Sequence, residues 1–440
     1  MDILIKIAQL FLCFTILVGI HELGHFLMAR AFKIRVEKFY IFFDPWFSLF
    51  KFKRGDTEYG LGWLPLGGYC KIAGMIDESM DKEPMKQPVK PDEFRAKPAW
   101  QRLLVMVAGV MMNVLLAIVI YCAVCYTWGD SYFSNQDAKW GYNFNPTAHE
   151  MGFRDGDRFV SIDGEEIDNV MRVQNDLLIT DGGRRVIVER GGEPVTLDIP
   201  FESLLRMRQE KAYEDLFTLR LPFIVDSVSY TSAVEAGLES GDEVVAIDDL
   251  RDADYPRYRD YLQKHKNDKV LLTVRRDGAL IDSLALPVDA EGRIGVTVTN
   301  PYSLRTQYYT FWESIPAGIH KAGKTISSYW DQLKLIVQPK TKMYEELGGF
   351  VAIGSIFPSS WDWHDFWLKT AFLSIILAVM NLLPIPGLDG GHALFTLWEI
   401  ITRRKPSEKF LEVAQYVGLM IILALLVYAN GNDIYRFFIK

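Results

Sequence analysis

Four long apolar runs divide an otherwise polar chain. They cover approximately residues 3–30, 102–128, 366–390 and 410–429. About 20 apolar residues in a helix cross the hydrocarbon core of a bilayer. The pattern therefore predicts four transmembrane helices. No small-residue cleavage site follows the first run, so we expect it to remain in the protein and not to act as a signal peptide.

The stretch between the first two runs carries a strand pattern. Residues 57–72 alternate in polarity and are punctuated by glycines, which predicts a β-hairpin and not a helix. Residues 77–98 are rich in Asp, Glu, Lys and Pro and are expected to form a solvated loop. We therefore expect residues 33–98 to form a membrane-associated β-hairpin followed by a loop.

The long stretch between the second and third runs contains a repeat. Residues 149–163 are echoed by residues 234–248, at an offset of 85 residues. In each copy a helix-like segment ends at a glycine and is followed by Gly-Asp and a β-run with Ile-Asp. This arrangement resembles the PDZ-like domains of bacterial proteases. It predicts two tandem α/β domains, at 129–215 and 216–300, and a helical connector over 301–365.

The composition fits a chain that is only partly embedded in a membrane. Hydrophobic residues make up 49% and charged residues 24% of the sequence. That is too many charges for a wholly embedded protein and too many apolar runs for a wholly soluble one. Lysine and arginine near the ends of the runs mark the cytoplasmic side. They are Lys33, Arg35, Lys38, Lys97, Arg102, Arg403, Arg404, Lys405 and Lys409. The stretch 129–365 and both termini are therefore expected to lie on the opposite side.

Ionisable residues interrupt the first apolar run. His21, Glu22 and His25 form an H-E-x-x-H pattern within it. A charged side chain near the centre of a membrane helix costs roughly 2.5–3.5 kcal/mol, so residues of this kind need a function. Residues four apart share one face of a helix, where two imidazoles bind one zinc ion and the glutamate serves as a general base. The alternative is a chance match to a short pattern, which the insertion cost disfavours.

A third metal ligand is expected from the third apolar run. Zinc enzymes usually supply three protein ligands and leave one position open. Asp389 stands in the segment N-L-L-P-I-P-G-L-D-G-G, in which Pro384 and Pro386 break the helix. Broken backbone at membrane depth is tolerated only where it is buried in protein or lines a wet cavity. We therefore expect Asp389 to complete the site. The alternative is a helix end with an Asp turn at the surface.

Together these motifs resemble the site-2 protease family of intramembrane zinc metalloproteases, and within it the bacterial RseP group. The resemblance covers almost the whole chain and includes residues 36–39, 58–59 and 65–69, as well as Asn113. It implies a single Zn²⁺ bound by His21, His25 and Asp389, with Glu22 as the catalytic base. It implies that the substrate-binding residues are Asn381, Pro384, Pro386, Gly67, Gly68 and Tyr69. Residues 67–72 would hold the substrate as an added β-strand.

The resemblance also implies an activity, partners and a location. Members of the family cut transmembrane helices inside the bilayer. The expected substrates are single-pass membrane proteins such as anti-sigma factors, together with signal-peptide remnants; membrane lipids surround the protein, and nucleic acid is not a partner. We expect a multi-pass protein of the bacterial inner membrane, with its PDZ-like domains in the periplasm and its active site toward the cytoplasm. The PDZ-like domains either capture peptides or act as a size filter, and the family favours the filter.

One position and one short element depart from the family pattern. Ile376 stands where many relatives carry an asparagine, five residues before Asn381. Phe42-Phe43-Asp44 replaces a Gly-Phe-Gly-like element. Both departures bear on details of substrate contact and not on the metal.

The sequence thus predicts an α+β membrane protein in which four transmembrane helices form the catalytic core. The expected segments are 1–32 (first transmembrane helix), 33–98 (hairpin and loop), 99–128 (second helix), 129–215 and 216–300 (PDZ-like domains), 301–365 (connector), 366–393 (third helix) and 394–440 (loop, fourth helix and tail). Two other classes compete with the protease: a non-catalytic PDZ scaffold and a transporter with broken helices. A complete set of ligands and the lack of an inverted membrane repeat favour the protease.

Overall fold

A computed structural model describes residues 2–64, 67–75, 88–213, 215–252 and 254–439 of the chain. The chain forms two compact units. One consists of Met1–Asp130 and Gln307–Lys440, and the other of Ser131–Thr306. The two ends of the sequence therefore fold together, and the middle folds separately. Part of the loop expected at 77–98 lies outside the described residues.

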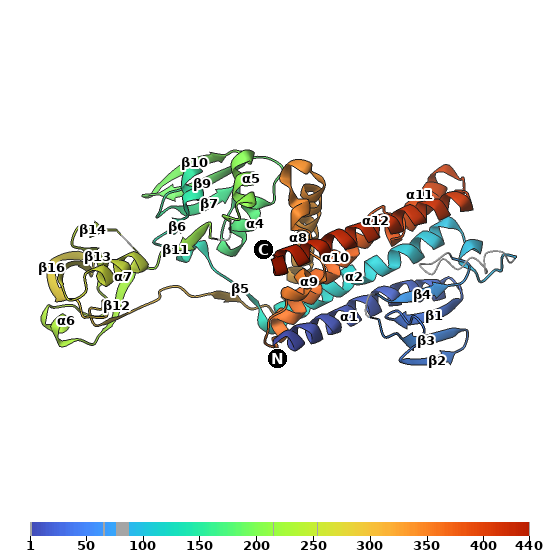
Figure 1. Ribbon diagram of the computed structural model, residues 1–440, viewed down its shortest axis with the longest axis horizontal. Coiled ribbons are helices and arrows are strands. Elements are labelled where there is room, and N and C mark those ends of the chain that lie inside the picture. Colours follow the sequence, from blue (N-terminus) through green and yellow to red (C-terminus); the bar gives the residue numbers. More distant parts are fainter. Residues whose placement is uncertain (1, 65–66, 76–87, 214, 253, 440) are drawn as a thin grey trace. The chain divides into compact units, whose positions relative to one another are not determined.

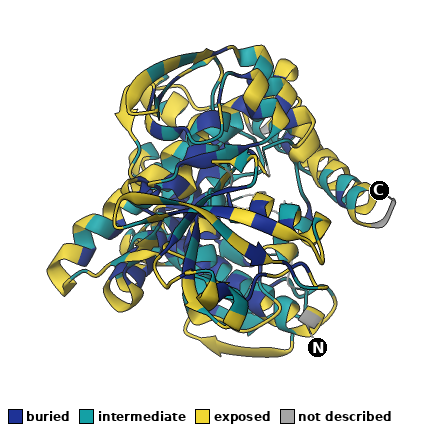
Figure 2. Cartoon of the chain, turned by 90° about the vertical axis from the view of Figure 1, so that its left-hand side faces the viewer, coloured by how far each residue is buried: buried dark blue, intermediate teal, exposed yellow. Residues whose placement is uncertain are grey.

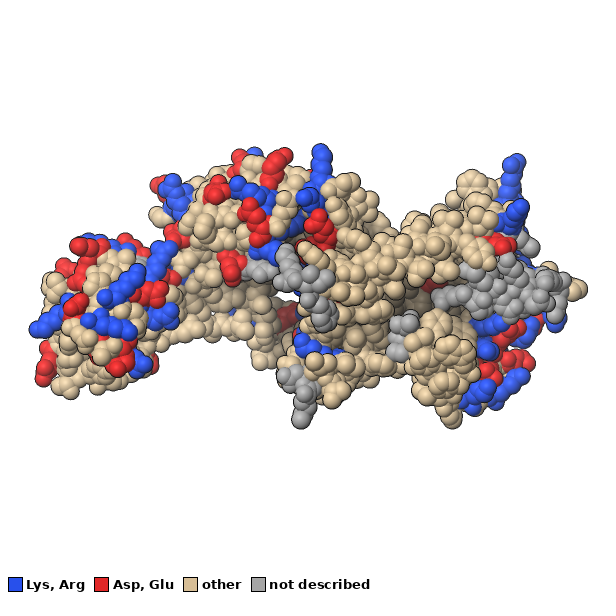
Figure 3. All heavy atoms as spheres, viewed as in Figure 1, with Lys and Arg blue, Asp and Glu red and all other residues tan. Residues whose placement is uncertain are grey.

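Long apolar helices dominate the first unit (Figure 1). Four described helices are long and apolar enough to cross a membrane: Ile3–Ala31, Ala99–Trp128, Trp363–Leu382 and Lys409–Phe437. The prediction of four such helices is confirmed. On the face seen in Figure 3 these helices carry few charged side chains, as lipid contact requires. The helices of this unit are α1 (Asp2–Ala31), α2 (Ala99–Trp128), α8 (Phe311–Val337), α9 (Phe350–Ser355), α10 (Trp363–Leu382), α11 (Asp389–Thr402) and α12 (Glu408–Ile434).

The third apolar run forms two helices, not one. Helix α10 ends at Leu382, and α11 begins at Asp389. The prolines between them, Pro384 and Pro386, cannot donate backbone hydrogen bonds, which explains the break. Helix α11 extends to Thr402 and so occupies part of the segment 394–440 where we expected a loop. The expected single span over 366–393 is corrected accordingly.

Helix α2 lies at the centre of the first unit. It packs against α1, α8, α10 and α11. Small residues allow the closest approaches between these helices. A Cβ atom added at Gly24 of α1 would lie 2.5 Å from the carbonyl oxygen of Ala108, and one added at Gly318 of α8 would lie 2.5 Å from Cys122. Gly24 is therefore fixed by packing as well as by its place in the H-E-x-x-H segment.

Replacing Gly24 by alanine is expected to destabilise the first unit by about 1–3 kcal/mol, because the added methyl group meets backbone atoms that cannot move aside. Thermal unfolding of the purified protein in detergent measures this change. Gly19→Ala, on the same helix, is the matched control, because a Cβ there meets only the end of the Ile41 side chain at 3.7 Å. Equal stabilities of the two variants would contradict the observed packing.

A four-stranded sheet packs beside α1. Its strands are β1 (Val36–Ile41), β2 (Phe50–Arg54), β3 (Thr57–Leu61) and β4 (Tyr69–Ile72), in the order β2-β3-β1-β4. Strands β3 and β4 pair with β1, in parallel and antiparallel directions respectively, and not with each other. The hairpin expected at 57–72 is therefore not formed, because β1 inserts between its two strands; β2 and β3 form a hairpin instead. Strand β4 ends the sheet, so its outer edge is unpaired within the described sheet.

The second unit contains two α/β parts in sequence. The first holds β6 (Tyr142–Phe144), α3 (Pro146–Glu150), β7 (Arg158–Ile162), β8 (Glu165–Glu166), α4 (Val173–Leu178), β9 (Arg184–Arg190), β10 (Glu193–Ile199), α5 (Phe201–Gln209) and β11 (Phe217–Leu219). The other holds β12 (Phe223–Val228), α6 (Thr231–Glu235), β13 (Glu243–Ile247), β14 (Leu250–Arg251), α7 (Tyr255–Lys264), β15 (Lys269–Arg276), β16 (Ala279–Pro287) and β17 (Val296–Val298). Each part has its own buried core. Buried residues alternate with more exposed ones along β15, and Figure 2 colours the chain by burial. Strands β5 (Asp130–Tyr132) and β18 (Arg305–Gln307) pair with each other.

The sequence repeat corresponds to a repeated ion pair in these two parts. Arg190 binds the fully buried Asp157 at 2.7 Å, and Arg276 binds the fully buried Asp242 at 2.7 Å. In each part the carboxylate also accepts a backbone N–H bond of 2.9 Å from three residues earlier. Burial disfavours the charge of Asp242, but the bonds from Arg276 and from the backbone outweigh it and hold the pKa of Asp242 below its usual value. The two parts therefore share a local architecture.

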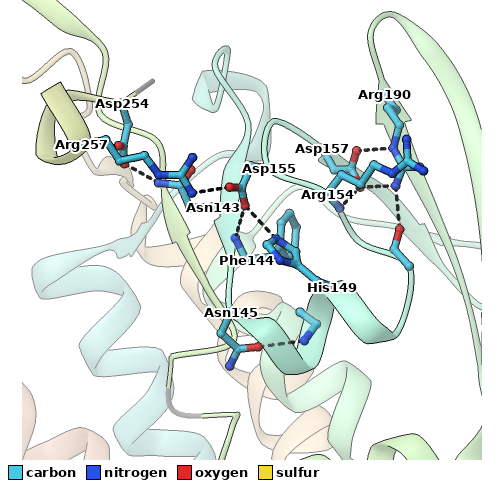
Figure 4. A network of polar contacts seen from close by, with 12 residues as sticks. Asn143, Phe144, Asn145, His149, Arg154, Asp155, Asp157, Arg190, Asp254 and Arg257 are labelled. Carbon is cyan, nitrogen blue, oxygen red and sulfur yellow. Dashed lines mark hydrogen bonds and ion pairs between the residues drawn. The ribbon is translucent and has the colours of Figure 1, made fainter. Parts of the chain in front are cut away.

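A polar network joins the two parts of this unit (Figure 4). The carboxylate of Asp155 accepts bonds from the backbone of Phe144, from His149 at 3.0 Å and from Arg257 at 2.6 Å. Burial opposes ionisation of Asp155, but these bonds prevail and lower its pKa. Arg257 belongs to α7 of the other part, so Asp155 bridges the two cores.

Candidate active site

The two histidines of α1 and the aspartate of α11 meet in the first unit. Nε2 of His21 lies 3.1 Å and Nε2 of His25 lies 3.2 Å from Oδ2 of Asp389. The two Nε2 atoms are 3.3 Å apart. The potential ligand atoms of the three residues all lie within 4.8 Å of one another. Residues from opposite ends of the sequence thus form one compact cluster, in which both histidines are buried.

The cluster fits a metal ion that binds nitrogen and oxygen. Oδ2 of Asp389 is buried and contacts the Nε2 atoms of both imidazoles, which suits an atom that shares a metal ion with them. Gly109 of α2 leaves space at the same point. A Cβ atom there would lie 2.4 Å from Nε2 of His25 and 2.9 Å from Nε2 of His21. Two imidazoles and a carboxylate are a common donor set for zinc in hydrolases.

Helix α2 holds the opposite nitrogen of each imidazole. Nδ1 of His25 donates to the carbonyl oxygen of Val105 at 2.8 Å. Nδ1 of His21 lies 3.2 Å from the side-chain nitrogen of Asn113, whose amide oxygen has no partner. Exchanging the oxygen and nitrogen of that amide gives Nδ1–H of His21 an acceptor. Hydrogen bonds of this kind fix the tautomer and the direction of a metal-binding imidazole.

Glu22 lies on the side of α1 that faces the sheet. A Cβ atom added at Gly68 would lie 3.4 Å from Cγ of Glu22 and 2.7 Å from Val18 of the same helix. The backbone N–H of Cys70 in β4 lies near the Glu22 carboxylate. The end of β4 therefore lies directly beside the glutamate that follows the first histidine.

The other residues singled out from the sequence lie on two elements. Gly67 and Gly68 precede β4 and Tyr69 begins it, and the hydroxyl of Tyr69 donates to Asp44 at 2.9 Å. Asn381 is half-buried in the last turn of α10. Pro384 is exposed in the break that follows. The carbonyl oxygen of Pro386 lies so close to α12 that Gly418 leaves no room for a side chain.

The departures from the family pattern have local structural consequences. Phe42 adopts a φ of +69°, a left-handed conformation that glycine reaches without strain and a bulky residue rarely adopts. The ring of Phe43 stacks on Tyr69 at 6.0 Å and lies against Gly67. Ile376 packs against the buried cluster that contains Leu17. Phe42 and Asp44 therefore stand where the family pattern places glycines, and Phe43 keeps the aromatic residue of that pattern against the start of β4.

Sequence reasoning missed three features of this site. It quoted Asn113 without a role, and it gave no part to Val105 or Gly109. Asn113 was named only as part of the family resemblance, but an asparagine inside an apolar membrane run is itself a signal of function. The other two contribute a backbone oxygen and an absent side chain, and only the packing of α1 on α2 reveals them.

Comparisons with known proteins agree with this site. The model of peptidase family M50 matches residues 9–425. A protein of Clostridium perfringens named "putative zinc metalloprotease" is 29% identical over 426 residues, which is 96% of each chain. A Vibrio cholerae protein of the same name is 29% identical over 99% of each chain. The regulator of sigma E protease of Haemophilus influenzae is 27% identical over 99% of this chain and 100% of its own length. The chain therefore belongs to peptidase family M50, the site-2 protease family, and is a zinc metalloprotease.

Proposed function

We propose that this metalloprotease cuts peptide bonds within the transmembrane segments of its substrates. The observation that supports this most strongly is the position of the cluster of His21, His25 and Asp389. Both histidines lie on α1, which is long and apolar enough to span a bilayer, and α2, which packs against both α1 and α11, is too. Ionisable groups at such a position are costly unless they have a function. A protease that acts on soluble substrates would have no need to carry its ligands there.

We infer that His21, His25 and Asp389 hold the zinc ion and that Glu22 is the general base. When bound, zinc supplies a Lewis acid that activates water and polarises the scissile carbonyl. Glu22 accepts the proton of the attacking water and delivers it to the leaving amine. Val105 and Asn113 keep the two imidazoles turned toward the metal position. The Glu22 carboxylate lies beside β4, close to the Cys70 amide.

Strand β4 is the proposed docking edge for the substrate. A peptide bond in a helix is shielded by the helix itself, so the substrate must become extended before it is cut. An unpaired strand edge binds such a segment through backbone hydrogen bonds. The outer edge of β4 meets this need because it lies beside Glu22. We assign Gly67, Gly68 and Tyr69 to this docking edge. Asn381, Pro384 and Pro386 are proposed to contact the substrate from the α10–α11 side.

Replacing Cys70 by proline is expected to lower cleavage at least tenfold while zinc content stays unchanged, because proline removes the N–H that β4 offers near Glu22. Cys70→Ala is the matched control, since it removes the thiol and keeps the N–H. Cleavage of a model transmembrane peptide and zinc analysis of the same preparations provide the measurement. Equal cleavage by the two variants would count against substrate docking at β4.

We propose an orientation of the chain in the membrane and a role for residues 131–306. The basic residues at the ends of the helices support a cytoplasmic placement of the sheet and of the α11–α12 connection. Residues 131–306 then lie in the periplasm of a bacterial cell, and their two parts are proposed to be PDZ-like domains that act as a size filter.

Anti-sigma factors already trimmed outside the membrane and remnant signal peptides are the proposed substrates. A substrate with a folded ectodomain should be cut much more slowly than its trimmed form, and equal rates would refute the filter.

Two measurements together test the proposed function. Purified protein should contain one zinc ion per chain, and it should cut a model peptide within its transmembrane segment. A PDZ scaffold would hold no zinc and cut nothing. A transporter would likewise leave the peptide intact, whatever its metal content.

A further inference from the structure

A largely buried ion pair links α2 to α11 away from the metal cluster. Nη2 of Arg102 lies 2.6 Å from Oε1 of Glu399. The two side chains are only 10% and 20% exposed. Arg102 stands in the first turn of α2, and Glu399 stands near the end of α11. Neither residue belongs to the cluster of ligands or to the proposed docking edge.

The two helices joined by this pair carry most of the metal site. Helix α11 begins at Asp389, and α2 supplies Val105, Gly109 and Asn113 around the histidines. Glu399 lies ten residues after Asp389 on α11, and Arg102 lies seven residues before Gly109 on α2. Helix α11 therefore runs from the metal position back toward the start of α2. A contact at its far end fixes both its rotation and its height on α2.

Arg102 also contacts the segment that follows β4. Its Nε donates to the carbonyl oxygen of Lys97 at 3.1 Å, and its guanidinium lies 6.0 Å from the ring of Phe94. The backbone N–H of Phe94 donates to Ala73, directly after β4, at 2.8 Å. One arginine thus touches the helix that carries Asp389 and the segment bonded to the end of the docking edge.

Stability alone does not explain a charge pair at this place. Removing two charges from water is costly, and replacing a buried pair by apolar residues of similar size is often neutral or stabilising. A buried pair with good geometry does impose one arrangement of the groups that carry it. Here the pair fixes the position of α11 on α2. Asp389, the first residue of α11, must bring its carboxylate to the two imidazoles.

We propose that Arg102 and Glu399 are a positioning pair that sets the Asp389 carboxylate at the metal position. This inference rests on the proposed function, because it takes Asp389 to be a zinc ligand. Neither member of the pair touches substrate or metal. The pair acts by fixing the position of α11 along α2. Its loss should therefore increase the rate of zinc release.

The release of zinc from the full-length protein tests this proposal. Purified, zinc-loaded protein in detergent is mixed with excess chelator, and the rate of zinc release is recorded beside the unfolding temperature of the metal-free form. Arg102→Gln, Glu399→Gln and the apolar double variant Arg102→Met/Glu399→Leu should each release zinc about tenfold faster than the unaltered protein. The exchanged pair Arg102→Glu/Glu399→Arg should restore slow release. Arg95→Gln is the matched control, because Arg95 makes a similarly buried bond of 2.7 Å to Glu93 in the segment before α2.

The outcomes separate this proposal from the proposed function. Unchanged release by the folded apolar double variant overturns the positioning role, since that variant removes the directional contact and leaves no unpaired charge. Fast release by a folded exchanged pair overturns it too. Asp389→Ala serves as the reference: if it loses zinc while the Arg102 and Glu399 variants retain it, only the positioning role fails. If the unaltered protein holds no zinc, the proposed function fails first.

Discussion

Glu22→Gln is expected to keep its zinc and to lose cleavage by about 10²–10⁴-fold, the range that a positioned acid–base group contributes. Glutamine has nearly the same size and can still accept hydrogen bonds through its amide oxygen, so the surroundings of the side chain are preserved. It cannot take the proton of the attacking water or return it to the leaving amine. Zinc analysis and the rate of peptide cleavage, measured on one preparation, check both halves of the expectation.

The matched control for this substitution is Glu37→Gln in β1. Glu37 makes a 3.1 Å contact with Arg35 and carries no proposed role in the chemistry. Its substitution should leave both zinc and cleavage within about twofold of the unaltered protein, as is usual for a partly exposed ion pair. Near-normal cleavage by Glu22→Gln would assign proton transfer to another group. Loss of zinc from Glu22→Gln would instead make Glu22 part of the ligand set.

The membrane helices could be predicted from the sequence because their signal is carried by each segment alone. An apolar run of sufficient length indicates contact with lipid, whatever the run packs against. Helix α11 was not predicted, because the prolines and glycines around Asp389 suggested the end of a helix and gave no sign that another begins there. The pairing of β3 and β4 was wrong for a similar reason. Alternation identifies strands, but it does not show that β1 lies between them.

The candidate ligands could be predicted from the spacing and chemistry of the residues. The contacts that hold these ligands in place could not. His21 and His25 follow from helical geometry, and Asp389 from a carboxylate beside a broken helix. The backbone oxygen of Val105 and the ion pair of Arg102 with Glu399 depend on how α2 meets α1 and α11. Such contacts join residues far apart in the chain, so no local sequence pattern predicts them.

Gly109→Ala is expected to weaken zinc binding at least 100-fold and to abolish cleavage, although residue 109 offers no ligand. The added methyl group would lie 2.4 Å from Nε2 of His25 and 2.7 Å from Cε1 of His21, closer than carbon atoms approach such groups. It would occupy the space that the two nitrogens and the Asp389 carboxylate face. The imidazoles would then have to turn away, which breaks the bonds that Val105 and Asn113 provide. Zinc affinity by competition with a chelator gives the measurement, and helix content shows that the variant is folded.

Gly19→Ala is the control for this substitution, because it adds the same methyl group to a membrane helix where only Ile41 lies near, at 3.7 Å. It should bind zinc as the unaltered protein does. Gly24→Ala adds a second comparison, since its clash is with the backbone of Ala108 and not with the histidines. If Gly109→Ala lost stability to the same extent as Gly24→Ala but kept its zinc affinity, the space beside Gly109 would serve helix packing alone, and the metal would have to lie elsewhere.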